Sequence, residues 1–117
     1  ATRDQVVPFD GGTLLSGPLA FMDLMSHDAS VAYFRRELGC SGDAKTARYD
    51  HHDDATAVVR RTWTGCARGA VEAWRIDGGG HRWPNGLPES PFAEFVGPVT
   101  REIDGSAAAF AFFSRFR

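Results

Sequence analysis

Asp4 and His81 are the residues of this chain whose types and settings point most directly to chemistry. His81 follows three glycines in IDGGGHRWPNG, residues 76–86, and Asp4 lies in TRDQVVPFDGG, residues 2–12. Histidine exchanges protons near neutral pH, and an aspartate bonded to its Nδ1–H fixes the tautomer and stabilises the imidazolium. Glycine runs occur where the backbone takes a positive φ or passes close to another group. A flexible loop with a surface histidine explains the second stretch equally well.

The order of these two residues matches the order of acid and base in one class of hydrolase. Asp4 follows what the sequence indicates is the tail of a strand, and His81 follows a second predicted strand. In α/β-hydrolases the catalytic serine comes first in the chain, then the acid, then the histidine. The G-x-S-x-G elbow that carries the serine is missing from the sequence, because neither Ser16 in TLLSGP nor Ser41 in GCSGD has glycines at the required offsets. We therefore expect the nucleophile to lie outside this chain.

Local patterns predict the elements that must position the pair. Apolar residues at helical spacing predict an amphipathic helix over residues 26–39, with Ser26 or Asp28 as its N-cap and Gly39 at its end. TAVVRRTWT and AVEAWRI, joined by GCARG, predict a β-hairpin over residues 56–76.

The remaining segments complete the predicted fold. DGSAAAFAFFSRF predicts a C-terminal helix with Asp104 as its N-cap, whereas residues 40–54 lack periodicity and are expected to be irregular. This order of strands and helices predicts an α/β sheet, in which functional residues collect in loops beyond the carboxyl ends of the strands. The predicted strands and helices are too few to complete such a sheet, so we expect a piece of a larger domain.

Composition and charge exclude several classes of partner. The 117 residues suffice for one small domain, and the net charge of -2 lacks the basic excess of a nucleic-acid-binding protein. The sequence has no run of about 18 apolar residues and no signal-peptide pattern at its start, so we expect no membrane association. It also lacks an initiator Met, which indicates a processed or truncated product.

Two further residue sets are candidates for metal binding and for covalent cross-linking. YDHHDD, residues 49–54, favours a solvated polar loop over a metal site, because adjacent histidines in extended backbone point to opposite sides. We predict no metal and no cofactor. Cys40 and Cys66 allow either two separate buried thiols or one disulfide, which would stabilise the fold by roughly 3 to 4 kcal/mol and indicate an oxidising compartment. A disulfide requires Cα atoms within about 7 Å of each other.

The two chemical stretches together resemble a known family. TRDQVVPFDGG resembles the G-T-x-D-x-x-V-P-Y-x-G-G segment, and IDGGGHRWPNG the G-G-G-H-x-W-P-G segment, of the secreted polyhydroxybutyrate depolymerase and feruloyl esterase family of α/β-hydrolases. The LGC, the TGC and the Phe-rich closing segment fit the C-terminal half of that family in the same order. The resemblance covers nearly the whole chain and implies that residues 1–117 are the C-terminal part of a single catalytic domain, with the last strands and helices of a mostly parallel sheet.

The resemblance also implies roles for individual residues. Asp4 becomes the triad acid, His81 the general base, and Cys40 and Cys66 the partners of a disulfide. Trp83 is a candidate wall of the substrate pocket, although packing against its own loop is the commoner role of a Trp-Pro pair.

The chain departs from the family pattern at three positions. Ala1 stands where the family usually has Gly, Phe9 replaces the usual Tyr, and Asn85 is inserted between Pro84 and Gly86. None of these changes touches a catalytic atom, but the insertion leaves the shape of the His81 loop open.

The expected function is that of a secreted or periplasmic serine esterase, a carboxylic-ester hydrolase to which this chain contributes the triad acid and base. Its substrate would be a polyester or a feruloylated or acetylated plant polysaccharide, and the sequence does not choose between them. The partner would be the remainder of the hydrolase domain, in the same chain or a second one, so the isolated chain is expected to be inactive. The alternative is a binding or structural module that keeps the hydrolase-like loops without catalysis.

Overall fold

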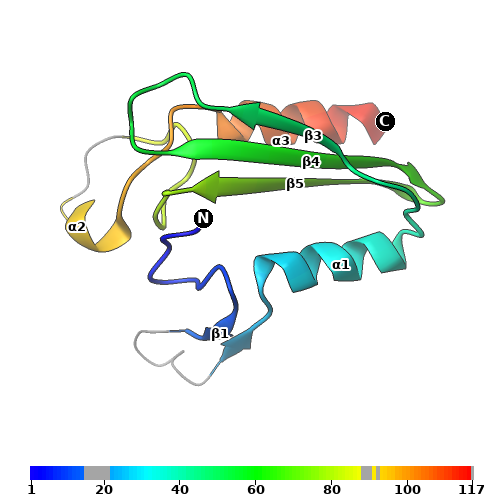
Figure 1. Ribbon diagram of the computed structural model, residues 1–117, viewed down its shortest axis with the longest axis horizontal. Helices are drawn as coiled ribbons and strands as arrows, with labels where there is room; N and C mark the ends of the chain where they lie inside the picture. The colour runs from blue at the N-terminus through cyan, green and yellow to red at the C-terminus, as the bar shows by residue number, and fades with distance from the viewer. Residues whose placement is uncertain (15–21, 88–90, 92, 117) are drawn as a thin grey trace.

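The main feature of the computed structural model, which describes residues 1–14, 22–87, 91 and 93–116, is a three-stranded sheet (Figure 1). Its strands lie in the order β3-β4-β5, and every pair is antiparallel. A second sheet consists of the short antiparallel pair β1 and β2. The strands are β1 (Gly12–Thr13), β2 (Asp23–Leu24), β3 (Lys45–Tyr49), β4 (Ala57–Cys66) and β5 (Gly69–Asp77).

The predicted α/β architecture, with the last strands of a mostly parallel sheet, is wrong for the described residues, because both of their sheets are antiparallel. The connections explain the direction of the strands. Residues 67–68 alone join β4 to β5, and residues 50–56 join β3 to β4, whereas parallel neighbours need a crossover of about a dozen residues or more. β3 itself lies in the segment that was predicted to be irregular, so that prediction was also wrong.

Helix α1 (His27–Glu37) confirms the predicted amphipathic helix and covers one face of the sheet. The Ser26 hydroxyl oxygen accepts a hydrogen bond from the Ala29 N–H, and Gly39 follows the helix with a φ of +64°. Behind the helix lies a buried apolar cluster. Its fully packed members are Trp63, Val71 and Ala73, against which Val31 and Leu38 pack.

The opposite face of the sheet is turned toward α3 (Gly105–Phe113), whose predicted N-cap Asp104 accepts a hydrogen bond from the Ala107 N–H. Side chains alternate along a strand, so Glu72 and Trp74 point away from α1. The Glu72 carboxylate accepts a hydrogen bond from Arg115, which lies in the short helix η2 (Ser114–Phe116) after α3. The sheet therefore lies between α1 and α3. A one-turn helix, α2 (Ala93–Val96), precedes α3.

The Cys40–Cys66 disulfide is confirmed and joins the end of α1 to the hairpin. The two Cα atoms lie 3.7 Å apart, within the predicted limit. Backbone bonds reinforce the junction, because the Ser41 N–H donates to the Gly65 carbonyl and the Ala67 N–H to the Gly39 carbonyl. Among the described residues, no helix has the length and apolar character needed to cross a membrane.

Candidate active site

Asp4 and His81 meet at the carboxyl end of β5, as predicted. The His81 Nδ1 and an Asp4 carboxylate oxygen, Oδ2, lie 2.9 Å apart. The histidine side chain is 45% exposed and the aspartate side chain 10%, so a largely buried carboxylate faces an accessible ring. This is the geometry in which a carboxylate selects the tautomer that leaves Nε2 free to accept a proton. No hydrogen bond joins Nε2 to another described residue.

The N-terminal segment reaches this position by pairing with the end of β5. The sequence predicted the tail of a strand here, but residues 2–10 form turns and bends. The Thr2 N–H donates to the Ile76 carbonyl and the Arg3 N–H to the Gly79 carbonyl, each at 2.9 Å. The Gly78 N–H donates to the Thr2 hydroxyl at 2.8 Å. These bonds bring together two residues that are 77 positions apart in the sequence.

The two oxygens of the Asp4 carboxylate have different partners. Oδ1 accepts hydrogen bonds from the Val6 and Val7 N–H groups at 2.9 and 2.8 Å, while Oδ2 faces the His81 ring. Burial by itself raises the pKa of Asp4, but the bonds from Val7, His81 and Val6 outweigh it and lower the pKa below its ordinary value of 3.8. The carboxylate is therefore ionised at neutral pH, as an acid that stabilises an imidazolium must be.

The glycine run before His81 is explained by two close approaches. Gly78 has a φ of +78°, and a Cβ on it would collide with the Ala55 carbonyl oxygen. A Cβ on Gly80 would collide with the Val96 carbonyl oxygen. The run thus lets the chain leave β5 between two other backbone segments, which is how the histidine reaches Asp4.

Residues 96–98 hold the His81 backbone, and sequence reasoning missed them. The His81 N–H donates to the Val96 carbonyl at 2.6 Å, and the Gly80 N–H donates to the Pro98 carbonyl at 2.9 Å. Gly97, between the two acceptors, has a φ of +76°. The Gly-Pro pair in FVGPV was the available signal, because it marks a turn whose glycine needs a positive φ.

Trp83 and the inserted Asn85 lie on the loop after the histidine. Trp83 is 60% exposed, and its Nε1–H donates to the Ser106 hydroxyl at the start of α3. The Asn85 N–H donates to the Thr100 carbonyl at 2.8 Å, and its φ is +57°. Asn85 therefore anchors the loop to the segment that contains Thr100. Trp83 borders an open hollow of about 280 Å³, whose lining also includes Ala1, Asp4, Gly80, His81 and Arg82.

Among the described residues, no serine hydroxyl is hydrogen-bonded to the His81 ring. Ser106 is bound to Trp83, and Ser41 donates to the Gly65 carbonyl at the opposite end of the hairpin. Ser16 lies outside the described residues.

The YDHHDD stretch forms a loop that the buried carboxylate of Glu102 holds in place. The Glu102 Oε2 accepts a hydrogen bond from the His51 N–H at 2.8 Å, and the Glu102 Oε1 accepts one from the His52 N–H at 2.6 Å. Within the part of the chain that the structure describes, no three His, Cys, Asp or Glu side chains gather in a way that could hold a metal ion. Glu102 was not singled out by the sequence, because its role depends on residues about 50 positions away.

Comparison with known proteins identifies no relative: no family model, no curated protein and no solved structure matches this chain.

Proposed function

We propose that Asp4 and His81 are the acid and the general base of a serine-dependent carboxylic-ester hydrolase. The observation that carries this proposal is the 2.9 Å approach of the His81 Nδ1 to a largely buried Asp4 carboxylate, with the ring itself accessible. The serine and the donors that stabilise the oxyanion belong to polypeptide outside this chain. The resemblance of the two loop sequences to the polyhydroxybutyrate depolymerase and feruloyl esterase family supports an ester as the substrate.

In this mechanism His81 carries one proton back and forth. Its Nε2 takes the proton of the serine hydroxyl as the oxygen attacks the ester carbonyl, and then gives it to the alcohol that leaves. In the second half, Nε2 takes a proton from water, the resulting hydroxide displaces the serine, and the proton returns to the serine oxygen. Asp4 holds the ring in the required tautomer throughout and stabilises the positive charge. Trp83 forms a wall beside the reacting groups.

The substrate proposed is a polyester or a feruloylated or acetylated plant polysaccharide, and the proposed location is outside the cell or in the periplasm. The disulfide between Cys40 and Cys66 supports the location, because such bonds persist in oxidising compartments. The partner is the rest of the hydrolase, in the same polypeptide or a second one.

Hydrolysis of p-nitrophenyl acetate tests the proposal. The purified 117-residue chain should be inert, whereas the polypeptide encoded by the complete reading frame that contains it should be active. His81→Ala should lower that activity by at least about 10³-fold. His51→Ala is the matched control, because the exposed His51 ring is not hydrogen-bonded to Asp4 or His81. This variant should leave the rate unchanged. A fluorophosphonate should label one serine in the active polypeptide.

Two outcomes would contradict the proposal. If the complete polypeptide shows no ester hydrolysis that depends on His81, the catalytic role fails and the non-catalytic binding module takes its place. If the isolated 117-residue chain hydrolyses the ester in a His81-dependent way, the nucleophile lies within this chain and its assignment to other polypeptide is wrong.

A further inference from the structure

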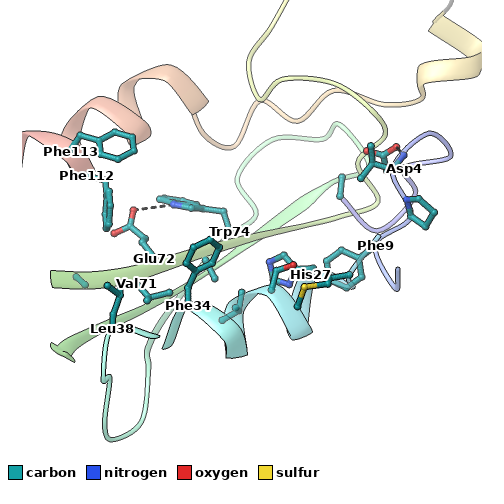
Figure 2. Close-up of a pocket in the computed structure, with 18 residues that line it drawn as sticks. Asp4, Phe9, His27, Phe34, Leu38, Val71, Glu72, Trp74, Phe112 and Phe113 are labelled. Atoms are coloured by element: carbon teal, nitrogen blue, oxygen red, sulfur yellow. Dashed lines mark hydrogen bonds between the residues drawn. The ribbon is translucent and has the colours of Figure 1, made fainter. Parts of the chain in front are cut away.

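The outer edge of β5 borders a large hollow. β5 is the last strand in the order β3-β4-β5, and among the described residues no strand pairs with its outer edge. A cavity of about 740 Å³ runs along that edge (Figure 2). Its lining includes Val71 and Ala73, which point to one face of the sheet, and Glu72 and Trp74, which point to the other. The cavity therefore wraps around the edge of the strand, and we call it the edge slot.

Two helices form apolar walls on either side of the edge slot. Phe34 lies on the α1 side, and Phe112 and Phe113 lie on the α3 side. Phe34 is 56% exposed and Phe113 is 69% exposed, so both leave large apolar surface in water. A strand with helices on both faces is typically apolar on both faces. The walls consequently favour an extended occupant that presents apolar side chains on both of its faces.

The acidic side chains of the edge slot are already paired. The Glu72 carboxylate accepts hydrogen bonds from the Trp74 Nε1–H at 3.0 Å and from Arg115 at 3.2 Å. Asp4, at the other end of the slot, is paired with His81. Because burying a charge without a partner is costly, the slot favours an uncharged occupant.

The chain itself shows how backbone can bind to this edge. The Thr2 N–H bonds to the Ile76 carbonyl and the Arg3 N–H to the Gly79 carbonyl, so the two segments advance in the same direction. The turn at residues 1–4 thus already occupies the carboxyl end of the edge, while the part beside residues 70–74 is left open.

We propose that the edge slot binds an extended, uncharged, apolar segment of another polypeptide, which pairs with β5 and runs in the same direction as β5. Main-chain hydrogen bonds to the strand edge would provide affinity, and the phenylalanine walls would select apolar side chains. The carboxyl end of the bound segment lies near Asp4. That such a segment also delivers the missing serine rests on the proposed function.

A strand-forming peptide tests the edge slot without any ester. The probe is a short peptide of alternating valine and isoleucine with lysines at both ends, used at concentrations where sedimentation shows it to be monomeric. Its control is the same peptide with a central proline, which removes a main-chain donor. On the ¹⁵N-labelled 117-residue chain, the probe should shift the amide signals of residues 69–77. A nitroxide at its carboxyl end should broaden the Arg3 signal, and one at its amino end the Gly69 signal.

Two exposed phenylalanines of α3 provide matched variants. Phe113→Lys places a charge in the edge slot and should weaken probe binding by about tenfold. Phe110 is 71% exposed but does not line the slot, so Phe110→Lys should change binding by less than about twofold. Both positions are exposed, so neither variant should prevent folding.

The proposal is overturned if the proline peptide binds as well as the probe, or if both lysine variants weaken binding alike. Either result would show that the surface binds apolar peptides without strand pairing or without specificity for the slot. A reversed nitroxide pattern would overturn the direction. Self-association of the chain that excludes the probe would make a second copy the occupant. Since binding is measured without turnover, failure of the slot and failure of the ester hydrolase are separate results.

Discussion

Asp4 and Glu102 are carboxylates that each bond to backbone N–H groups and face a histidine ring, but they do so in different ways. Glu102 gives one oxygen to each of two backbone N–H groups, and the His52 ring lies farther away, with Nδ1 3.4 Å from Oε1. Asp4 gives one oxygen to backbone N–H groups and keeps the other for the His81 ring at 2.9 Å. The first carboxylate fixes a loop, whereas the second orients an imidazole. The two roles differ because the backbone leaves one oxygen of Asp4 free for the histidine ring, whereas it occupies both oxygens of Glu102.

Asp4→Asn should separate these roles most strongly. The amide can hold the ring in the wrong tautomer, and a comparable change in a well-studied triad costs about 10⁴ in rate. In the polypeptide of the complete reading frame, kcat/KM for p-nitrophenyl acetate should fall to that extent. On the isolated chain, ¹⁵N shifts of the His81 ring should show the tautomer change. Glu102→Gln, assayed below its unfolding temperature, should leave kcat/KM within about threefold of the parent value. Equal losses in the two variants would show that Asp4 is also only a loop anchor.

Gly80→Ala should displace the His81 ring from the Asp4 carboxylate without removing either side chain. The new Cβ would push against the Val96 carbonyl, to which the His81 backbone is bonded. A displacement of the base by about 1 Å costs on the order of 10² in rate, so kcat/KM should fall by that factor. Gly65→Ala is the control, because the nearest atom to its Cβ would be the Ser41 carbonyl oxygen, at 3.4 Å. Unchanged activity in Gly80→Ala would show that the glycine does not position the histidine.

Glu102→Gln should act on stability. The Glu102 side chain is fully buried, and its replacement turns an NH₂ group toward one of the two N–H donors. Thermal unfolding followed by circular dichroism should show a melting temperature lower by about 10 °C. A variant as stable as the parent would mean that the loop does not need the carboxylate.

Acid should weaken the fold through both carboxylates. Burial raises the pKa of Glu102, but the His51 and His52 N–H bonds outweigh it, so its pKa lies below the ordinary 4.5, as that of Asp4 lies below 3.8. The unfolded chain then binds more protons, so their stabilisation is complete above about pH 4.5 and is lost as the pH falls through the folded values. The free energy of unfolding, measured in urea from pH 6 to pH 3, should fall with pH. The slope should be smaller in Glu102→Gln, and an equal slope would contradict the assignment.

Trp83→Phe should have the smallest effect. It removes the Nε1–H bond to the Ser106 hydroxyl, an exposed bond whose loss should cost about 0.5 kcal/mol in urea unfolding. Ser106→Ala should cost the same, and the double variant should cost no more than either single one, because both remove one interaction. Additive losses would show that the two side chains act separately.

The elements predicted correctly are those whose signals are local. Ser26 precedes α1, Gly39 follows it, and Asp104 precedes α3, so these residues help to locate both helices. The hairpin of β4 and β5 follows from its apolar strands and its glycine-containing turn. Asp4 and His81 were found because each stands in a distinctive loop sequence.

The features that sequence reasoning missed depend on distant partners. β3 is a short strand of mostly polar residues, and only its pairing with β4 makes it a strand. Residues 96–98 matter because of where their carbonyls lie relative to Gly80 and His81. The direction of the sheet was predicted from the order of elements, whereas the short connections of the hairpins determine it.

The bond between Cys40 and Cys66 also makes the chain tolerant of a break. The residues between the two cysteines include all of β3 and the exposed turn that contains His51. A protease that cuts this turn would open the backbone, but the disulfide would still link the two pieces, and the pairing of β3 with β4 would help to keep them in register. Nicked protein would therefore migrate as one species on a gel until a reductant separates it.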